Sequence, residues 1–188
     1  MTTGTVVHLM RHGEPVLAGR LLGHTDCPAT PAGIAACRAA AARLEVTEIV
    51  SSDLLRAHAC AQAIAGHSLP VRLDPRWREL DFGAWDGCLA AEVDSQALAR
   101  FWDDPDAAPP PGGECWSALV ARVGAALAEI TEPALVVTHA GAMRAALASA
   151  CGFDARQVWA FDLPYAGILS LRLWPGPPPA GQIVGLTA

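Results

Sequence analysis

Residues 6–14 read Val6-Val7-His8-Leu9-Met10-Arg11-His12-Gly13-Glu14. The apolar half predicts a buried strand, which ends abruptly in a permanent cation, an imidazole, a glycine and a carboxylate. In open α/β sheets, ligands bind beyond the carboxyl ends of parallel strands, where loops determine what is exposed. The stretch therefore predicts a strand that leads into a functional site, with His12 as a nucleophile or base and Arg11 as a ligand for an oxyanion.

The same pattern returns near the other end of the chain. An apolar, β-rich run at 134–138 stops at His139-Ala140-Gly141. A single histidine at a strand end is commonly a hydrogen-bonded structural residue. Two histidines that each follow a buried-strand pattern, and that each precede a glycine by one or two residues, indicate one shared site if their strands are neighbours.

Residues 11–14 together with His139 resemble the histidine phosphatase superfamily, the group that contains the cofactor-dependent phosphoglycerate mutases. Three further segments match in family order, at 51–57, 78–87 and 112–114. Each segment is weak alone, but the ordered set is specific and covers most of the chain. Within the superfamily, the spacing and the Phe-Gly-x-Trp-x-Gly segment are most similar to the α-ribazole phosphatases and related small phosphatases.

Composition restricts the chemistry that the chain can perform. The chain has 188 residues, 52% of them hydrophobic, and a net charge of −6, which argues against a general nucleic-acid or anionic-membrane surface. All thirteen basic residues are arginine. The absence of lysine excludes a Walker lysine, a Schiff-base lysine and the usual kinase lysine. Catalysis must therefore depend on arginine, histidine and carboxylates.

Cysteine usage and hydropathy indicate a cytoplasmic protein. The six cysteines are scattered, without a Cys-x-x-Cys pair or zinc-ligand spacing, and are typical of reduced thiols. We expect no signal peptide and no membrane span, because no uncharged apolar run approaches about 18 residues. The expected partner is a small phosphorylated substrate, with no nucleic acid and no membrane, and the expected oligomeric state is a monomer or homodimer.

Alternating strand and helix patterns predict a three-layer α/β/α sandwich with a mostly parallel sheet. The expected strands are 5–10, 47–51, 71–73, 134–138, 166–173 and 181–186. The expected helices are 30–44 with Thr30 as N-cap, 53–65 with Asp53 as N-cap, 114–130 and 142–150.

The resemblance implies six strands in the order 3-2-4-1-5-6 with strand 5 antiparallel, so that His12 and His139 share one pocket. We expect a single domain over 1–188. Residues 88–113 are acidic and rich in proline, and we expect them to form a small lid-like insertion over the site, with one short helix near 89–101.

The resemblance also implies a role for each site residue. His12 is the nucleophile that becomes phosphohistidine, Arg11 and Arg56 hold the phosphoryl oxygens, His139 donates to the phosphoryl group, and Glu79 supplies the proton to the leaving group. The alternative for Glu79 is an ion pair with Arg76 or Arg78. No metal and no cofactor are expected.

Several positions have weaker predictions. Gly23, His24 and Ala140 are candidate substrate contacts. Cys60 replaces a threonine that is frequent in the family, a change expected to affect packing. Arg144 is interpreted as a helix-capping or structural residue. Four tryptophans lie in the middle third of the chain, and most are expected to pack in the core or the insertion, while one or two could stack on an aromatic leaving group: Trp77, Trp85, Trp102 and Trp116.

The favoured function is a metal-independent phosphomonoesterase that acts through a phosphohistidine, with α-ribazole 5′-phosphate as a possible substrate. The alternatives are a cofactor-dependent phosphoglycerate mutase, a protein-phosphohistidine phosphatase and a non-catalytic phosphate sensor. Mutase relatives shield the phosphoenzyme from water with longer insertions and a C-terminal tail. The short chain therefore favours hydrolysis.

Overall fold

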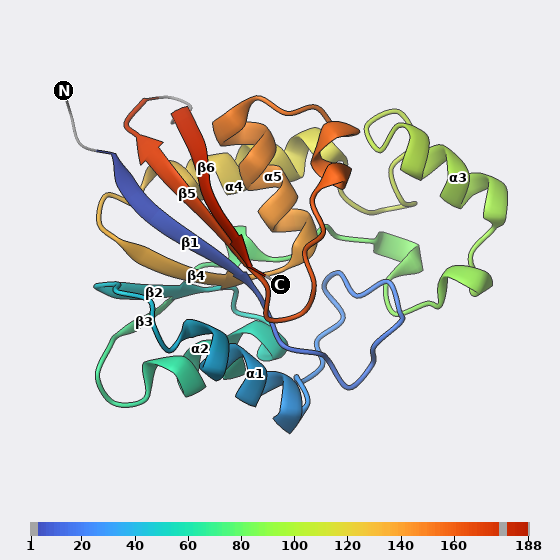
Figure 1. Ribbon diagram of the computed structural model, residues 1–188. Helices are drawn as coiled ribbons and strands as arrows, with labels where there is room; N and C mark the ends of the chain where they lie inside the picture. The colour runs from blue at the N-terminus through green and yellow to red at the C-terminus, as the bar shows by residue number, and fades with distance from the viewer. Residues whose placement is uncertain (1–3, 177–179, 188) are drawn as a thin grey trace.

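The computed structural model describes residues 4–176 and 180–187. Its six strands form one sheet in the order β3-β2-β4-β1-β5-β6, as Figure 1 shows. Strands β1 to β4 are mutually parallel, β5 is antiparallel to β1, and β6 is antiparallel to β5. The predicted strand order and the antiparallel fifth strand are therefore confirmed. The strands are β1 (Thr5–Arg11), β2 (Glu48–Ser51), β3 (Val71–Leu73), β4 (Ala134–Thr138), β5 (Ile168–Trp174) and β6 (Ala180–Thr187).

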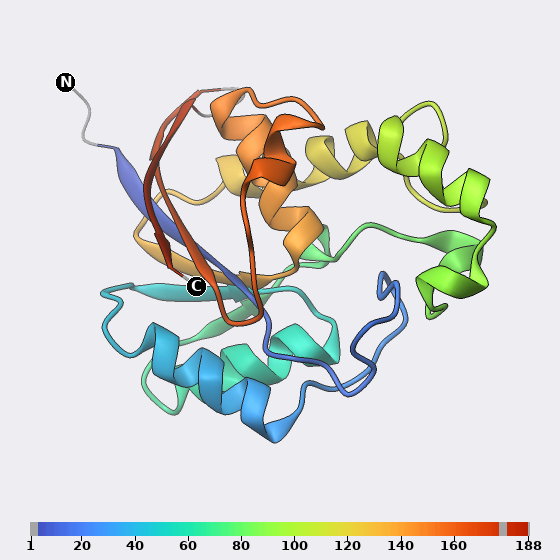
Figure 2. The same ribbon diagram turned by 45° about the vertical axis from the view of Figure 1, so that its right-hand side comes forward.

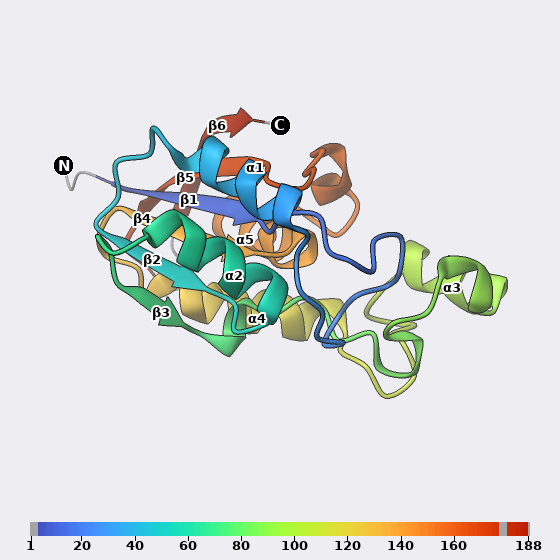
Figure 3. The same ribbon diagram turned by 90° about the horizontal axis from the view of Figure 1, so that it is seen from below.

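Helices cover both faces of the sheet, which confirms the three-layer sandwich. Helices α1 (Pro31–Ala41) and α2 (Leu55–Ala65) lie on one face, and α4 (Trp116–Ala128) and α5 (Ala140–Cys151) lie on the other (Figures 2 and 3). Each face buries its own hydrophobic cluster against the sheet. The central strand β4 is buried at every position, as a strand packed on both faces should be.

Two predicted helix starts can be compared with the structure. The Thr30 side chain accepts a hydrogen bond from the Gly33 amide, and Pro31 occupies the first helical position, as predicted. The prediction that Asp53 caps α2 was wrong. Leu54 is the N-cap residue and makes no side-chain cap bond, because the Asp53 carboxylate binds the Arg78 guanidinium in two places instead.

Strand register brings the two histidine segments together. Arg11, the last residue of β1, pairs with Thr138, the last residue of β4. The His12 amide then donates to the Thr138 carbonyl oxygen at 2.8 Å. Because parallel neighbours end at the same edge of a sheet, His12 and His139 leave their strands side by side.

Residues 88–113 contain a 3₁₀ turn (Ala90–Glu92) and helix α3 (Ser95–Asp103), which stands beside the sandwich in Figures 1 and 3. The α3 residue Phe101 is 3% exposed, and its ring lies 6.0 Å from the Phe82 ring and 5.8 Å from the Trp85 ring. This aromatic contact fixes α3 against the 82–85 segment. The single domain and the lid-like role of 88–113 remain predictions.

Candidate active site

His12 and His139 form a buried pair, with ring centroids 5.0 Å apart and an interplanar angle of 63°. His12 is 5% exposed and His139 is fully buried. His12 Nδ1 donates to the Gly13 carbonyl oxygen at 2.7 Å, because a carbonyl oxygen can only accept. In the neutral ring this places the proton on Nδ1 and leaves the lone pair on Nε2. His12 therefore presents an unprotonated nitrogen that can act as a nucleophile.

Burial and nearby cations keep both rings neutral. Burial, followed by the charges of Arg56 and Arg11, lowers the pKa of His12 to about 3, although the hydrogen bond to Gly13 opposes this shift. The pKa of His139 also lies well below its usual value. Burial is the largest cause, and the positive charge of Arg56 is the second. A protonated imidazole has no lone pair to attack phosphorus. The low pKa of His12 therefore favours nucleophilic chemistry over a wide range of pH.

We expect the His12 ring to remain neutral where an ordinary histidine titrates. In the native protein its ring NMR signals should stay constant from about pH 8 to about pH 5, whereas in urea they should shift with a pKa of about 6.5. Assignment by His12→Gln identifies the signals. A native titration near the unfolded value would contradict the account of this site.

The loop that carries His12 is held by close backbone packing and one sulfur. A Cβ atom at Gly13 would overlap the Gly33 backbone, so only glycine fits there. The Gly13 amide donates to Cys60 Sγ at 3.3 Å. Cys60 replaces the threonine of the family pattern, yet it still supplies an acceptor to this loop. Its contribution is thus more than the packing that the sequence indicated.

The two arginines predicted to bind phosphate, Arg11 and Arg56, differ in whether they line the cavity. Arg11 lines the cavity, donates through Nη1 to the Leu163 carbonyl at 2.8 Å, and lies over the Tyr165 ring with Cζ 3.9 Å from its centroid. Arg56 is fully buried and does not line the cavity. Its Nη atoms donate to the backbone carbonyls of Leu22, Gly23 and Thr25.

In each of these two arginines, Nε is buried and has no hydrogen-bond partner among the residues that the structure describes. Arg56 therefore holds the 22–25 loop and places positive charge beside both histidines. The expectation that Arg56 holds phosphoryl oxygens remains a prediction, and its Nη atoms already bind the 22–25 loop.

Glu79 lines the same cavity, and its carboxylate is oriented by two backbone donors. Oε1 accepts from the Leu80 amide at 2.8 Å and Oε2 from the Gly141 amide at 3.0 Å. Glycine at position 141 leaves room for this orientation, because a Cβ atom there would overlap the Glu79 carboxylate. Neither predicted ion-pair partner binds Glu79.

Those two arginines bind other carboxylates. Arg76 pairs with Asp74 and Glu129, and Arg78 pairs with Asp53. The salt-bridge alternative for Glu79 was therefore wrong.

Arg122 positions the segment that carries Glu79, a role that the sequence did not reveal. Its guanidinium binds the Glu114 carboxylate at 2.7 and 2.8 Å. It also donates to the backbone carbonyls of Arg76, Arg78 and Glu79 at 2.7 to 2.8 Å. The carboxylate of the 112–114 segment thus acts on the site through Arg122.

The three weaker candidates separate into two groups. Ala140, the first residue of α5, lines the cavity. Gly23 and His24 do not line it, and their amides donate instead to the Asp86 carboxylate at 3.1 and 2.5 Å. The loop folds this way because one carboxylate satisfies successive amides. Any substrate contact by Gly23 or His24 remains a prediction.

A family model described as histidine phosphatase superfamily (branch 1) matches residues 7–180. The chain belongs to the histidine phosphatase superfamily. It is 34% identical over 164 residues to a probable phosphoglycerate mutase GpmB of Proteus mirabilis, covering 79% of this chain and 76% of that protein. Five ordered motifs were therefore sufficient to recognise the superfamily from the sequence.

Solved structures place this histidine phosphatase among phosphatases. A putative alpha-ribazole-5′-P phosphatase from Escherichia coli has a TM-score of 0.84 and 24% identity, covers 98% of this chain and 97% of its own, and supports the fold. A mycobacterial glucosyl-3-phosphoglycerate phosphatase has a TM-score of 0.84 and 26% identity, and covers 95% and 96%. The second of these neighbours, together with the family match, supports a phosphatase-type enzyme.

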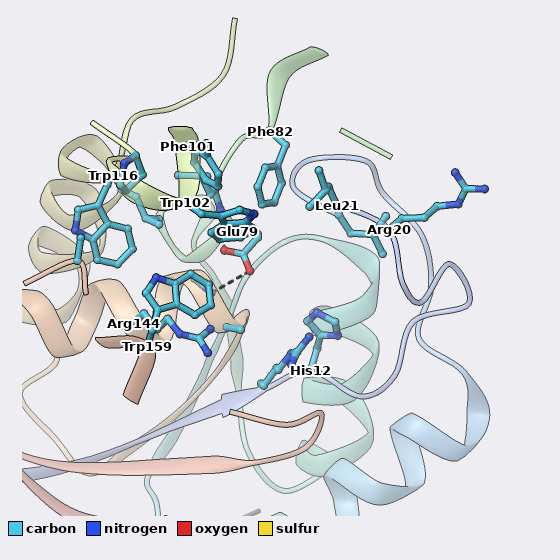
Figure 4. A pocket seen from close by; sticks show the side chains of 18 of the residues that line it. His12, Arg20, Leu21, Glu79, Phe82, Phe101, Trp102, Trp116, Arg144 and Trp159 are labelled. Atoms are coloured by element: carbon cyan, nitrogen blue, oxygen red, sulfur yellow. Dashed lines mark hydrogen bonds between the residues drawn. The ribbon is translucent and has the colours of Figure 1, made fainter. Parts of the chain in front are cut away.

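The cavity of this histidine phosphatase has a volume of about 320 Å³ and runs from His12 to a wall of aromatic side chains (Figure 4). Trp102 of α3 and Trp116 of α4 line it, whereas Trp77 and Trp85 are buried in the core. The sequence missed Trp159 and Tyr165, which also line the cavity. Both lie in the irregular segment between α5 and β5, where no periodic pattern marks a residue as facing a site.

Arg144 also lines the cavity, which corrects its interpretation as a capping or structural arginine. It lies four residues after Ala140 on α5, so the two residues share one helix face. That spacing was a signal available in the sequence.

Two further findings concern residues 4–176 and 180–187 only. In these ranges no group of three or more histidine, cysteine, aspartate or glutamate side chains is placed to hold a metal ion. No helix there has both the length and the apolar character needed to cross a membrane.

Proposed function

We propose that this histidine phosphatase is a metal-independent phosphomonoesterase that transfers the phosphoryl group of a small ester to His12 and then to water. The observation that carries the proposal is the neutral, buried His12–His139 pair, because His12 lines one end of a cavity that Arg11 and Glu79 also line. Histidine, arginine and glutamate supply the nucleophile, the positive charge and the acid that this reaction needs.

The first step forms a bond between His12 Nε2 and phosphorus and breaks the bond between phosphorus and the ester oxygen. Glu79, in its protonated form, gives its proton to the departing alkoxide. Arg11 stabilises the negative charge on the phosphoryl oxygens.

His139 has a donor available for the same oxygens. Its Nε2 lies 2.9 Å from the Ser52 hydroxyl, and its Nδ1 is buried without a partner within the described ranges. If the hydroxyl donates to Nε2, Nδ1 carries the proton and can donate to a phosphoryl oxygen.

The second step returns the phosphoryl group to water. Glu79, now ionised, takes a proton from the attacking water, the new bond joins the water oxygen to phosphorus, and the bond to Nε2 breaks. The products are inorganic phosphate and the original enzyme. No other reactant is required.

We propose α-ribazole 5′-phosphate as the substrate, with related aromatic esters as the wider class. Two observations support this choice. The cavity places Trp102, Trp116 and Trp159 beyond the phosphoryl site, where they suit a flat aromatic leaving group. A structural neighbour that covers 98% of the chain is described as a putative alpha-ribazole-5′-P phosphatase.

Mutase activity is the second candidate, because the Proteus relative is named a probable phosphoglycerate mutase. We expect hydrolysis to be faster, because the cavity reaches the surface at Trp102 and Trp159, which are 44% and 51% exposed. Water can then reach phosphorylated His12. With 3-phosphoglycerate and a bisphosphoglycerate primer, inorganic phosphate should exceed 2-phosphoglycerate by at least about tenfold. Faster isomerisation than phosphate release would establish the mutase instead.

Activity should not depend on a divalent metal, because arginine supplies the positive charge that a metal would supply. After exhaustive dialysis against a chelator, kcat with p-nitrophenyl phosphate should stay within about twofold of its starting value. A loss of activity that magnesium or zinc restores, while calcium does not, would overturn this part of the proposal.

A further inference from the structure

Arg144 lines the part of the cavity where, in the proposed reaction, the first atoms of the leaving alcohol lie. In the proposed reaction the phosphoryl group binds near His12 and Ala140, which line the cavity at the carboxyl edge of the sheet. Arg144 lies about one helical turn farther along α5, roughly 5 to 6 Å away along the axis. Figure 4 shows its guanidinium group beside the Trp159 ring. A group bonded to the ester oxygen would therefore meet Arg144 before it meets the aromatic wall.

The contacts of Arg144 hold the guanidinium in place without using all its donors. Nη2 donates to the Phe161 carbonyl at 3.2 Å, and Cζ lies 4.1 Å from the centroid of the Trp159 ring. Nε is buried and has no partner among the residues that the structure describes. A buried cationic donor without a partner is costly, so a ligand oxygen that completes it is bound strongly.

The charge balance around Arg144 favours a neutral oxygen as its ligand. Burial lowers the pKa of Arg144, while the carboxylate of Glu79 raises it and Arg11 lowers it. Arg11 already faces the phosphoryl oxygens, and Glu79 must give a proton beside the same ester oxygen. A hydroxyl or ring oxygen of the alcohol accepts from Arg144 without adding a second negative charge next to Glu79.

Beyond Arg144 the cavity is lined by aromatic side chains. The Trp102 and Trp159 rings meet edge to face, with centroids 5.1 Å apart and an interplanar angle of 84°. Trp102 belongs to α3, and Trp159 belongs to the 3₁₀ helix Gln157–Ala160. Trp116 and Phe82 line the same part of the cavity. A three-carbon acid would reach Arg144 and leave these rings uncovered, whereas a flat ring system would cover them.

We propose that Arg144 is a specificity-determining residue that donates to a sugar oxygen of the leaving alcohol, and that Trp159 and Trp102 contact a flat aromatic group attached to that sugar. The site then selects 5′-phosphates of aromatic ribosides over phosphate esters that lack the sugar or the ring. This inference rests on the proposed phosphatase activity and adds the residues that choose among its substrates.

Four esters separate the two parts of the leaving group. α-Ribazole 5′-phosphate has both sugar and ring, ribose 5-phosphate has only the sugar, phenyl phosphate has only the ring, and methyl phosphate has neither. kcat/KM is measured for each ester with the wild type, Arg144→Leu, Arg144→Lys and Trp159→Leu. Arg38→Leu, an exposed arginine of α1, is the matched control.

We expect Arg144→Leu to lower the ratio of kcat/KM for α-ribazole 5′-phosphate to that for phenyl phosphate by about 10- to 100-fold, the range of one charge-assisted hydrogen bond. Arg144→Lys should recover part of this ratio, because it keeps a cationic donor but not the planar fork. Trp159→Leu should lower the ratio of α-ribazole 5′-phosphate to ribose 5-phosphate by about tenfold. Arg38→Leu should change neither ratio.

An unchanged ratio in Arg144→Leu would overturn the inference, whether or not the absolute rates fall, because Arg144 would then not select the sugar. Circular dichroism identifies a variant that fails to fold, in which case Arg144→Lys decides the matter by the same ratio. If the wild type hydrolyses none of the four esters, the proposed function itself fails. Hydrolysis of all four with ratios that no variant alters removes only the inference about specificity.

Discussion

Replacing His12 with alanine is expected to lower kcat for p-nitrophenyl phosphate by at least about 10³-fold, because the variant has no nitrogen to form the covalent intermediate. The side chain is 5% exposed and its ring packs between His139 and Tyr165, so the substitution removes the nucleophile from a preformed site. Steady-state release of p-nitrophenolate measures the effect.

His67→Ala is the matched control for this substitution, since His67 is exposed after the end of α2. It should retain wild-type kcat. Far-ultraviolet circular dichroism and thermal melting of His12→Ala show whether the fold survives. If a folded His12→Ala variant keeps more than about a tenth of the wild-type kcat, the nucleophile is another residue.

Replacing Glu79 with glutamine should separate substrates by their leaving groups. Glutamine keeps the shape of glutamate and cannot give up a proton. Hydrolysis of α-ribazole 5′-phosphate, which releases a basic alkoxide, should slow by about 10²- to 10⁴-fold. Release of p-nitrophenolate, a stable anion, should slow far less in the first step. The rate of the first turnover, measured by rapid mixing, isolates that step.

Glu132→Gln, on an exposed carboxylate, is the control and should leave both rates unchanged. An equal loss for both substrates in Glu79→Gln would contradict the role of Glu79 as a general acid. It would point instead to the orientation of the site through the Leu80 and Gly141 amides.

Most of the fold could be predicted because the strands of the sheet correspond to local hydrophobic patterns in the sequence. Local sequence patterns, most of them apolar runs, predicted all six strands, and Thr30-Pro31 predicted the start of α1. The site edge was predictable for the same reason, since His12 and His139 come directly after such runs. That β1 and β4 are neighbours came from the resemblance to the family, because periodicity contains no information about which strands pair.

The rest of the site depends on contacts between distant residues. Asp53 resembles an N-cap locally, but Arg78, 25 residues later, takes its carboxylate. Arg56 matched a phosphate-binding pattern, yet three carbonyls of the 22–25 loop occupy its Nη atoms. Arg122 positions Glu79 from a helix 43 residues away. Such long-range pairings are set by tertiary packing and leave no local signal.

The specificity pocket was the least predictable part of the molecule. Trp102, Trp116 and Trp159 come from three separate helical segments, and only the folded chain brings them to one cavity. From sequence alone a tryptophan is as compatible with a core as with a binding site. Trp77 and Trp85 are both buried in the core, so two of the four predicted candidates are core residues.

The central claim is that turnover passes through a phosphohistidine at His12, and trapping that species tests it most directly. The wild-type enzyme is mixed rapidly with p-nitrophenyl phosphate and denatured at alkaline pH, where phosphohistidine survives, within the first turnovers. Intact-protein mass spectrometry followed by peptide mapping should find one added phosphoryl group, carried by His12 and absent from His12→Ala. A phosphoryl group on another residue, or none at all during steady turnover, would contradict the account.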